Sequence, residues 1–257
     1  HIKIESFGDS SFMKKYLITN DKKQVVIKDR EEVLIVDERT SASDLEIIIG
    51  EHARVQYVWL MTSVSSEEAV SRKLTVGEGS KLEAWQIYNS TSGANLAIEN
   101  NLGERVNFEN HVLFYQGGTS KLSVKDNYHF NKPGAYGRFT VEGMASDSAQ
   151  VEYFSDLQIK PDSQKIDSRI DMKLHLLSEK CRGTLLPALQ IDANDVKAGH
   201  SATTFKLTPE DMFYLESRGL ALSAIKALVM QSTVRHFVEG LEDEELKNKI
   251  ISTLSVM

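Results

Sequence analysis

The sequence predicts an all-β core over residues 1–207, followed by a small α-helical region over residues 208–257. A Gly-Glu pair recurs at Gly50, Gly77 and Gly103, with spacings of 77 − 50 = 27 and 103 − 77 = 26 residues. No helical periodicity interrupts residues 24–200, whereas a helical pattern begins at Thr208. The recurrence and the late change of period together define this fold class.

Each Gly-Glu pair precedes a strand-like run, over residues 53–59, 81–87 and 106–112, and further strands are expected at 73–76, 97–98 and 121–124. We interpret Ala145-Ser146-Asp147, before residues 149–154, as a fourth, degenerate copy. A repeat of this length, built from strands and Gly turns, is typical of a solenoid or a meander. Because ordinary parallel sheets need helical crossovers, the residues favour a β-helix or an antiparallel sandwich and leave both open.

The segment 185–219 joins the two regions. Apolar alternation predicts a strand over residues 185–191, with Leu185 and Leu189 on one face and Leu186 on the other. An Asx-rich turn over 192–195 leads to a short strand over 196–198 and to His200, in a polar loop or strand end.

The helical region begins with a clear start signal. Thr208 is a suitable N-cap, a proline occupies the first helical position, and Asp211 completes a capping box for a helix over residues 209–218 that ends at Gly219. We expect Ser223 to cap a second, largely apolar helix, and the acidic residues 242–245 to begin a third. These helices are expected to pack on the end of the β region.

Composition limits the function classes. Hydrophobic residues make up 41% of the 257 residues, enough for a sizeable core, and the net charge of −7 argues against nucleic-acid or anionic-membrane binding. The apolar runs are too short to span a bilayer, and no signal peptide is visible. The single cysteine, Cys181, fits a reducing compartment, so a cytoplasmic protein is expected. His1 is interpreted as a trimmed or tagged start and is excluded from the fold argument.

The run LQIDANDVKAGHSATT, followed by MFYLESRGL, resembles the signature of the SufB/SufD family, the scaffold subunits of the SUF iron–sulfur cluster assembly machinery. The resemblance is long, ungapped and in two parts, and it is densest over the last third of the chain. It implies a right-handed parallel β-helix and a scaffold or accessory subunit that is not itself an enzyme. It also implies a SufC-type ABC ATPase partner, pairing with a SufB-like partner or with itself as a homodimer, and a transient rather than tightly bound iron–sulfur cluster.

Two residues are candidate metal ligands. From the residues alone, His200 reads more readily as a histidine bonded to backbone, but the resemblance aligns it with the family's interface histidine, and imidazole suits ferrous iron. Cys181 lies between Lys180 and Arg182, which would favour a thiolate if the thiol is exposed, whereas free cysteine is commonly a small core residue. The SufB scaffold cysteine falls near Met172 here and is missing, so the chain resembles SufD or a divergent member.

The candidate partner-binding residues are Phe213, Tyr214 and Arg218, because the resemblance implies that the C-terminal helices dock onto the ATPase and such residues are favoured interface anchors. Met212 and Leu215 are expected in the core. The sequence contains no Walker-type phosphate loop, zinc-ligand spacing or hydrolase elbow. Two alternatives remain open: a β-helix carbohydrate-active enzyme using Asp192, Asp195 and His200, and a structural homodimer without a cluster role.

Overall fold

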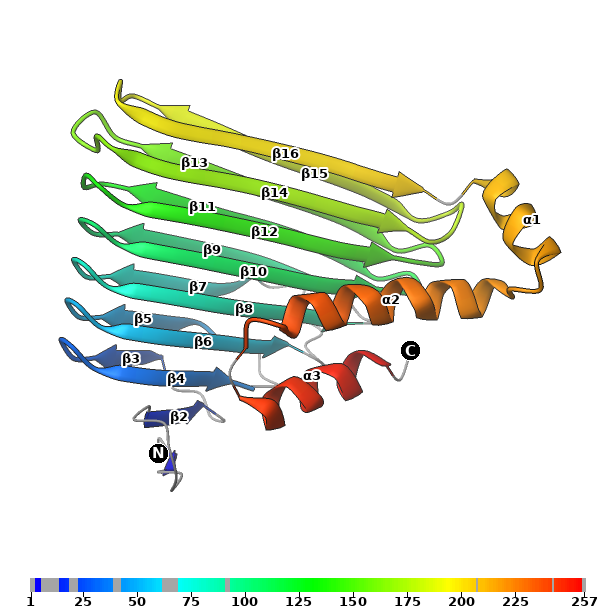
Figure 1. The fold of residues 1–257 in the computed structure, drawn as a ribbon, viewed down its shortest axis with the longest axis horizontal. Helices are drawn as coiled ribbons and strands as arrows, with labels where there is room; N and C mark the ends of the chain where they lie inside the picture. Colours follow the sequence, from blue (N-terminus) through cyan, green and yellow to red (C-terminus); the bar gives the residue numbers. More distant parts are fainter. Residues whose placement is uncertain are drawn as a thin grey trace.

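The computed structural model describes residues 3–5, 14–18, 23–38, 43–61, 69–90, 93–206, 208–241 and 243–255, which form two sheets and three helices (Figure 1). Sheet A contains, in order across the sheet, β1 (Lys3–Glu5), β2 (Lys14–Ile18), β4 (Glu32–Asp37), β6 (Arg54–Met61), β8 (Lys81–Ser90), β10 (Asn107–Gln116), β12 (Tyr136–Ala145), β14 (Ile166–Leu176) and β16 (Val196–Lys206). Sheet B contains β3 (Gln24–Ile27), β5 (Leu45–Ile49), β7 (Ala69–Val76), β9 (Ala94–Leu102), β11 (Lys121–Phe130), β13 (Gln150–Ile159) and β15 (Arg182–Ile191).

Successive strands alternate between the sheets, so that each coil of the chain contributes one strand to sheet A and one to sheet B. Apart from the antiparallel pair β1–β2, the strand pairs in the described ranges are parallel. Arg54 pairs with Lys81, and Lys81 pairs with Asn107, which gives coil lengths of 81 − 54 = 27 and 107 − 81 = 26 residues. The β-helix is therefore confirmed, and the antiparallel sandwich is excluded.

The Gly-Glu repeat marks the turns that lead from sheet B to sheet A. The residues after these pairs, His52, Gly79 and Arg105, have left-handed φ values of 53°, 64° and 52°. The N–H groups of His52 and Gly79 each donate to a glutamate carbonyl of the next turn at 2.8 Å. A Cβ atom at Gly77 would lie 2.6 Å from the carbonyl carbon and oxygen of Gly50, so only glycine allows this stacking.

The predicted fourth copy is wrong. Ala145-Ser146-Asp147 lies at the opposite edge, where the chain passes from sheet A to sheet B. The next turn of the Gly-Glu stack contains Pro133, whose carbonyl accepts the N–H of Arg105 at 3.0 Å. Asn107 pairs with Tyr136, so this coil has 136 − 107 = 29 residues. Because this coil is longer than the two before it, the spacing of the Gly-Glu pairs does not predict where its turn lies.

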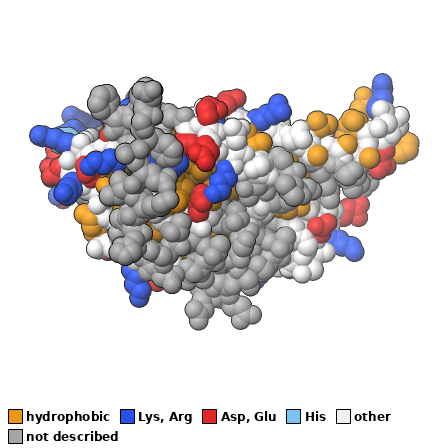
Figure 2. Space-filling model, turned by 90° about the horizontal axis from the view of Figure 1, so that it is seen from below, with side chains coloured by type: hydrophobic (Ala, Val, Ile, Leu, Met, Phe, Trp, Pro, Cys, Tyr) orange, Lys and Arg blue, Asp and Glu red, His pale blue; other side chains and the backbone are white. Residues whose placement is uncertain are grey.

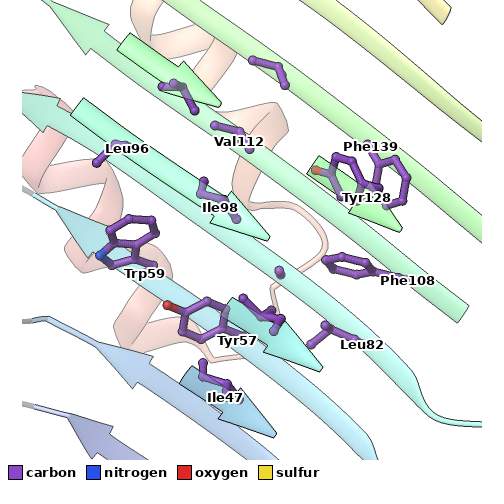
Figure 3. Close-up of a cluster of buried hydrophobic side chains, with 14 of the residues drawn as sticks. Ile47, Tyr57, Trp59, Leu82, Leu96, Ile98, Phe108, Val112, Tyr128 and Phe139 are labelled. Atoms are coloured by element: carbon purple, nitrogen blue, oxygen red, sulfur yellow. The ribbon is translucent and has the colours of Figure 1, made fainter. Parts of the chain in front are cut away.

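The interior between the two sheets, here called the lumen, is filled by every second side chain of each strand. In β11 the inward residues are at most 1% exposed, although one of them is an aspartate: Leu122, Val124, Asp126, Tyr128 and Phe130. The ring of Tyr128 lies 3.6 Å from that of Phe139 across the lumen (Figure 3). The core is thus a column of aliphatic and aromatic layers with polar groups among them.

The first strands of sheet A are apolar on their outer face as well, through Leu34, Val36, Val58, Leu60, Trp85 and Ile87. Helices α2 (Leu222–Val238) and α3 (Glu244–Ser255) cover this face with Met230, Val234, Val238, Leu246, Ile250 and Leu254. In Figure 1, α1 lies beyond the end of β16, and α2 lies below it and runs lengthwise along the strands, across the side of the β-helix near β8 and β10. The expectation that the helices pack on its end is therefore wrong, because the uncovered apolar surface lies on this side.

The starts of α2 and α3 differ in their caps. For α2 the predicted cap is wrong: Ala221 precedes the helix without a side-chain cap, and Ser223 lies inside it. The Asp243 carboxylate accepts the N–H of Leu246 at 2.9 Å, so it caps the start of α3, and it also pairs with Lys15 of β2 at 3.0 Å. None of the helices in the described ranges is long and apolar enough to cross a membrane.

Candidate functional site: the open end of the β-helix and helix α1

His200 lies in the middle of a strand and not in a loop. β16 runs over eleven residues and pairs with β14 along its whole length, with His200 opposite Ile170. Ile170 is a lumen residue with 0% exposure, so His200 points to the same side of the sheet. His200 is nevertheless exposed, because β15 and β16 form the last described coil and nothing in the described ranges covers it.

This last coil leaves the lumen open at one end. Leu185 and Leu189 of β15, with Val196 and Ala198 of β16, pack against the core and are only partly buried. Each of the two strands is hydrogen-bonded to a single neighbour, β13 or β14, so both have a free edge. The site therefore combines two unpaired strand edges, a partly exposed apolar interior and one histidine.

Cys181 is not part of this site. Its side chain is buried, with 1% exposure, and the thiol lies 3.1 Å from the Ser178 carbonyl oxygen and 3.4 Å from that of Ala145. Across sheet A, Ala145 pairs with Leu176, and Leu176 pairs with Lys206 at the end of β16. Lys206 lies six residues beyond His200, which is roughly 20 Å along the strand. The structure does not bring the two predicted ligands together, and in the described ranges no group of three or more His, Cys, Asp or Glu side chains could hold a metal ion.

Two further predicted positions lie near the open end. Met172, which aligns with the SufB cysteine, is fully buried in the lumen and pairs with Ala202. Asp195 lines a shallow hollow of about 230 Å³ beside Lys165 and Lys197, but Asp192 and His200 do not line it. The acid–base group imagined for a carbohydrate-active enzyme therefore does not share this hollow.

Helix α1 (Pro209–Ser217) has the predicted ends. Thr208 and Asp211 form a complete capping box, and Gly219 has φ 84°. The N–H of Leu220 donates to the Leu215 carbonyl at 3.1 Å, as in a Schellman C-cap. These local contacts define both ends of α1, which projects beyond the β-helix in Figure 1.

The candidate anchors on α1 are exposed. Phe213 is 75% and Tyr214 57% exposed, and the Arg218 guanidinium lies 5.3 Å from the centre of the Tyr214 ring. Figure 2 shows apolar side chains at the tip of the projecting arm, beside charged ones. Leu215, expected in the core, is only half-buried, and the side chain of Met212 lies outside the described parts. The prediction for Leu215 is wrong because α1 does not lie on the β-helix.

Sequence reasoning missed a cavity of about 360 Å³ between the C-terminal turn of α2 and the outer face of sheet A. Trp85 and His111 form part of its floor, with ring centres 5.6 Å apart, and Phe237 lines it from the helix. Burial lowers the pKa of His111, while the carboxylates of nearby glutamates act in the opposite direction. The lining of the cavity contains both acidic and basic side chains. The cavity could be predicted only from the position of α2 over the sheet.

Sequence reasoning also missed the polar groups of the lumen. Asp126 is fully buried there, and desolvation raises its pKa to about 6. The available signal was a polar residue at an inward position of an alternating strand, between Val124 and Tyr128.

The fold and the site define a class: a parallel β-helix with one open end and a projecting helical arm. The sequence profile described as "SUF system FeS cluster assembly, SufBD core domain" matches residues 5–233, which is most of the chain. The chain therefore belongs to the SufBD core domain family of the SUF iron–sulfur cluster assembly system.

Similar curated proteins carry related names. The chain is 27% identical over 218 residues to the iron–sulfur cluster assembly protein SufD of Bacillus subtilis, covering 81% of this chain and 48% of that protein. It is 25% identical over 111 residues to SufD of Escherichia coli, covering 43% and 26%. It is 25% identical over 215 residues to the SufBD family protein Rv1461 of Mycobacterium tuberculosis, covering 78% and 23%. The chain thus spans about half, or less, of the length of these relatives.

Proposed function

We propose that this chain works as a SufD-like scaffold or accessory subunit in iron–sulfur cluster assembly, not as an enzyme. In this proposal its open end pairs with a second β-helix, from a SufB-like partner or another copy, and α1 docks an ABC-type ATPase. The observation that carries the proposal is the last coil, whose strands of ten and eleven residues each have an unpaired edge. Long unpaired edges are normally covered by another strand or element.

Self-pairing has a natural register. A two-fold axis at Ser201, the midpoint of β16, would pair this strand antiparallel with its copy, so that His200 falls opposite the second copy's Ala202. The two His200 residues would then be diagonal neighbours on the lumen side, roughly 7–8 Å apart between their Cα atoms. An iron–sulfur cargo held there would lie between chains and have few protein ligands, which fits transient rather than tight binding.

The test is a substitution inside the proposed interface. Ala202→Glu places a charge on the lumen side of β16, opposite the second strand, and should convert a dimer into a monomer at micromolar concentration by sedimentation velocity. The matched control is Thr203→Glu, the next residue, which faces outward beside Lys173 and should leave the dimer intact. The two variants, Ala202→Glu and Thr203→Glu, are also tested for binding to a co-expressed SufB-like partner.

Both residues are exposed in the single chain, so neither substitution should unfold it, and the circular dichroism spectrum should be that of the wild type; any fall in the melting temperature of Ala202→Glu should not exceed the loss of dimer stabilisation. If Ala202→Glu pairs as well as the wild type, or if the wild type is monomeric alone and with the partner, the open end is not an interface and the proposal is wrong.

A further inference from the structure

Asp126 is an isolated carboxyl group in the middle of the β-helix. Its side chain is 0% exposed and accepts three hydrogen bonds, from the hydroxyls of Tyr128 at 2.7 Å and Tyr153 at 3.1 Å and from the amide of Asn100 at 2.9 Å. Among the described residues of its inward row, the only other charged side chain, that of Arg72 on β7, is paired with Asp37 at 3.2 Å. The ionised form therefore has donors but no counter-ion.

The donors belong to a network that crosses the lumen. The Tyr128 hydroxyl also accepts from the amide of Asn110 at 2.7 Å, and the carbonyl oxygen of Asn110 accepts from Gln86 at 2.9 Å. Gln86 in turn accepts the hydroxyl of Tyr88. The carboxyl group on sheet B is thus connected to strands β8 and β10 of sheet A through four side chains, those of Tyr128, Asn110, Gln86 and Tyr88.

Two neighbouring acceptors have no hydrogen-bond partner. The amide oxygen of Asn100 is buried and unpartnered, and so is the hydroxyl of Ser155, which is directly opposite Asp126 in the register of β11 and β13. An ionised carboxylate cannot donate to either oxygen, whereas a protonated carboxyl can. The Ser155 hydroxyl can also donate, whereas the Asn100 oxygen can only accept. Because buried polar atoms are nearly always satisfied, the unpartnered Asn100 oxygen indicates that the site also accommodates the neutral acid.

We propose that Asp126 is a proton-binding site inside the β-helix that gains and loses its proton near neutral pH. When the proton is bound, the Asn100 amide or the Ser155 hydroxyl accepts it, and the Tyr153 hydroxyl turns from Asp126. Tyr153 pairs with Leu185 of the last coil, so the site lies one coil from the open end. This inference is independent of the proposed function.

The electrostatics agree with this geometry. Desolvation raises the pKa of Asp126 to about 6 from an ordinary 3.8, against the lowering effect of the hydrogen bonds from Tyr128, Tyr153 and Asn100; the charge of Glu99, which faces outward on β9, adds to the rise. Burial also raises the pKa values of Tyr88, Tyr128 and Tyr153 well above 10, so these hydroxyls stay protonated and Asp126 is the group that titrates.

The sign follows from linkage. A carboxyl pKa raised on folding means that the folded state binds the proton more tightly than the unfolded state. The stabilisation is fully present below about pH 3.8 and is lost as the pH rises through about 6. The size of the rise corresponds to roughly a hundredfold in proton affinity.

The test compares urea unfolding of the wild type and Asp126→Asn from pH 4 to pH 8. The unfolding equilibrium constant of the wild type should rise relative to that of Asp126→Asn by between about tenfold and a hundredfold over this range. The control is Asp156→Asn, which removes another buried carboxyl, one whose oxygen accepts from Gln158 and Gln190 on the outer face of sheet B. Because Asp156→Asn keeps Asp126, its unfolding equilibrium constant should still rise relative to that of Asp126→Asn over this range.

A direct readout covers the case in which Asp126→Asn fails to fold. In wild-type protein with ¹³C-labelled aspartate, one carboxyl resonance should titrate near pH 6, and Tyr153→Phe, which removes a donor to the ionised form, should move its midpoint upward. If every aspartate resonance titrates near pH 4 or below, or if the stability ratio to Asp126→Asn is constant with pH, Asp126 does not exchange a proton near neutrality and the inference is wrong.

Discussion

His200 is set apart from the other lumen residues of sheet A by one circumstance, its position in the last coil. Ile170, one coil earlier in the same row, is fully buried, whereas His200 is exposed. An exposed imidazole on a free strand edge can gain a ligand without losing any packing. A substitution at His200 can therefore test the proposed iron binding without a loss of stability.

Replacing His200 with Ala should lower the iron retained per chain after anaerobic reconstitution and gel filtration, while the melting temperature stays unchanged because the side chain is exposed. The control is His236→Ala, a histidine on α2 whose side chain is 80% exposed and which lies on the outer side of sheet A, whereas His200 is on the lumen side. Equal iron in the two variants would mean that His200 has a structural role only.

At the scale of elements, the sequence predicted what local chemistry determines. The capping box at Thr208 and the stop at Gly219 need only neighbouring residues, and both are confirmed. β16 was underestimated as a strand of three residues, because Gly199 to Thr204 lack apolar alternation. It extends over eleven residues because β14 supplies a partner for its backbone, which no local pattern can reveal.

The helix α1 carries the prediction for the ATPase. Tyr214→Ala or Arg218→Ala should weaken binding of an ABC-type ATPase by about 2 kcal/mol or more, because exposed aromatic and arginine side chains are the usual anchors of such interfaces. The measurement is a quantitative pull-down beside melting curves. Gln231→Ala, an exposed residue on α2, is the control and should bind normally.

Leu215→Ala should cost less than the 2–5 kcal/mol typical of a fully buried leucine, because this side chain is half-buried. If Tyr214→Ala and Arg218→Ala both melt normally and bind the ATPase at full strength, the docking surface lies elsewhere.

At the scale of the whole molecule, the sequence predicted a β repeat followed by helices but not where the helices lie. The run from Val55 to Met61 is buried at every position, which indicates a strand covered on both faces. The alternation of apolar and polar residues shows which side chains face inward, but not which side chains they contact in the lumen. For that reason neither the α2 cover, nor the cavity beneath it, nor the network around Asp126 could be derived before the coils were stacked.

The hairpin of α2 and α3 connects the end of the chain to its first coils. Ion pairs join Lys15 to Asp243 at 3.0 Å and Lys249 to Glu38 at 2.5 Å, and the fully buried Ile250 packs in the same apolar cluster as Val36 and Trp85. The first coils have short strands and depend on this cover, whereas the later coils have strands of about ten residues and do not contact the hairpin cluster to the same extent. The hairpin should therefore stabilise one end of the β-helix in particular.

Ile250→Ala should destabilise the protein by about 2–5 kcal/mol, since it leaves a cavity between α3 and sheet A. Hydrogen exchange should accelerate first in β4 and β6, while β12 and β14 keep their protection, because local stability follows local burial. Leu228→Ala, on the same hairpin but 56% exposed, is the control and should change neither stability nor exchange. A uniform loss of protection from β4 to β14 would mean that the β-helix unfolds as one unit, and the hairpin would then stabilise all coils equally.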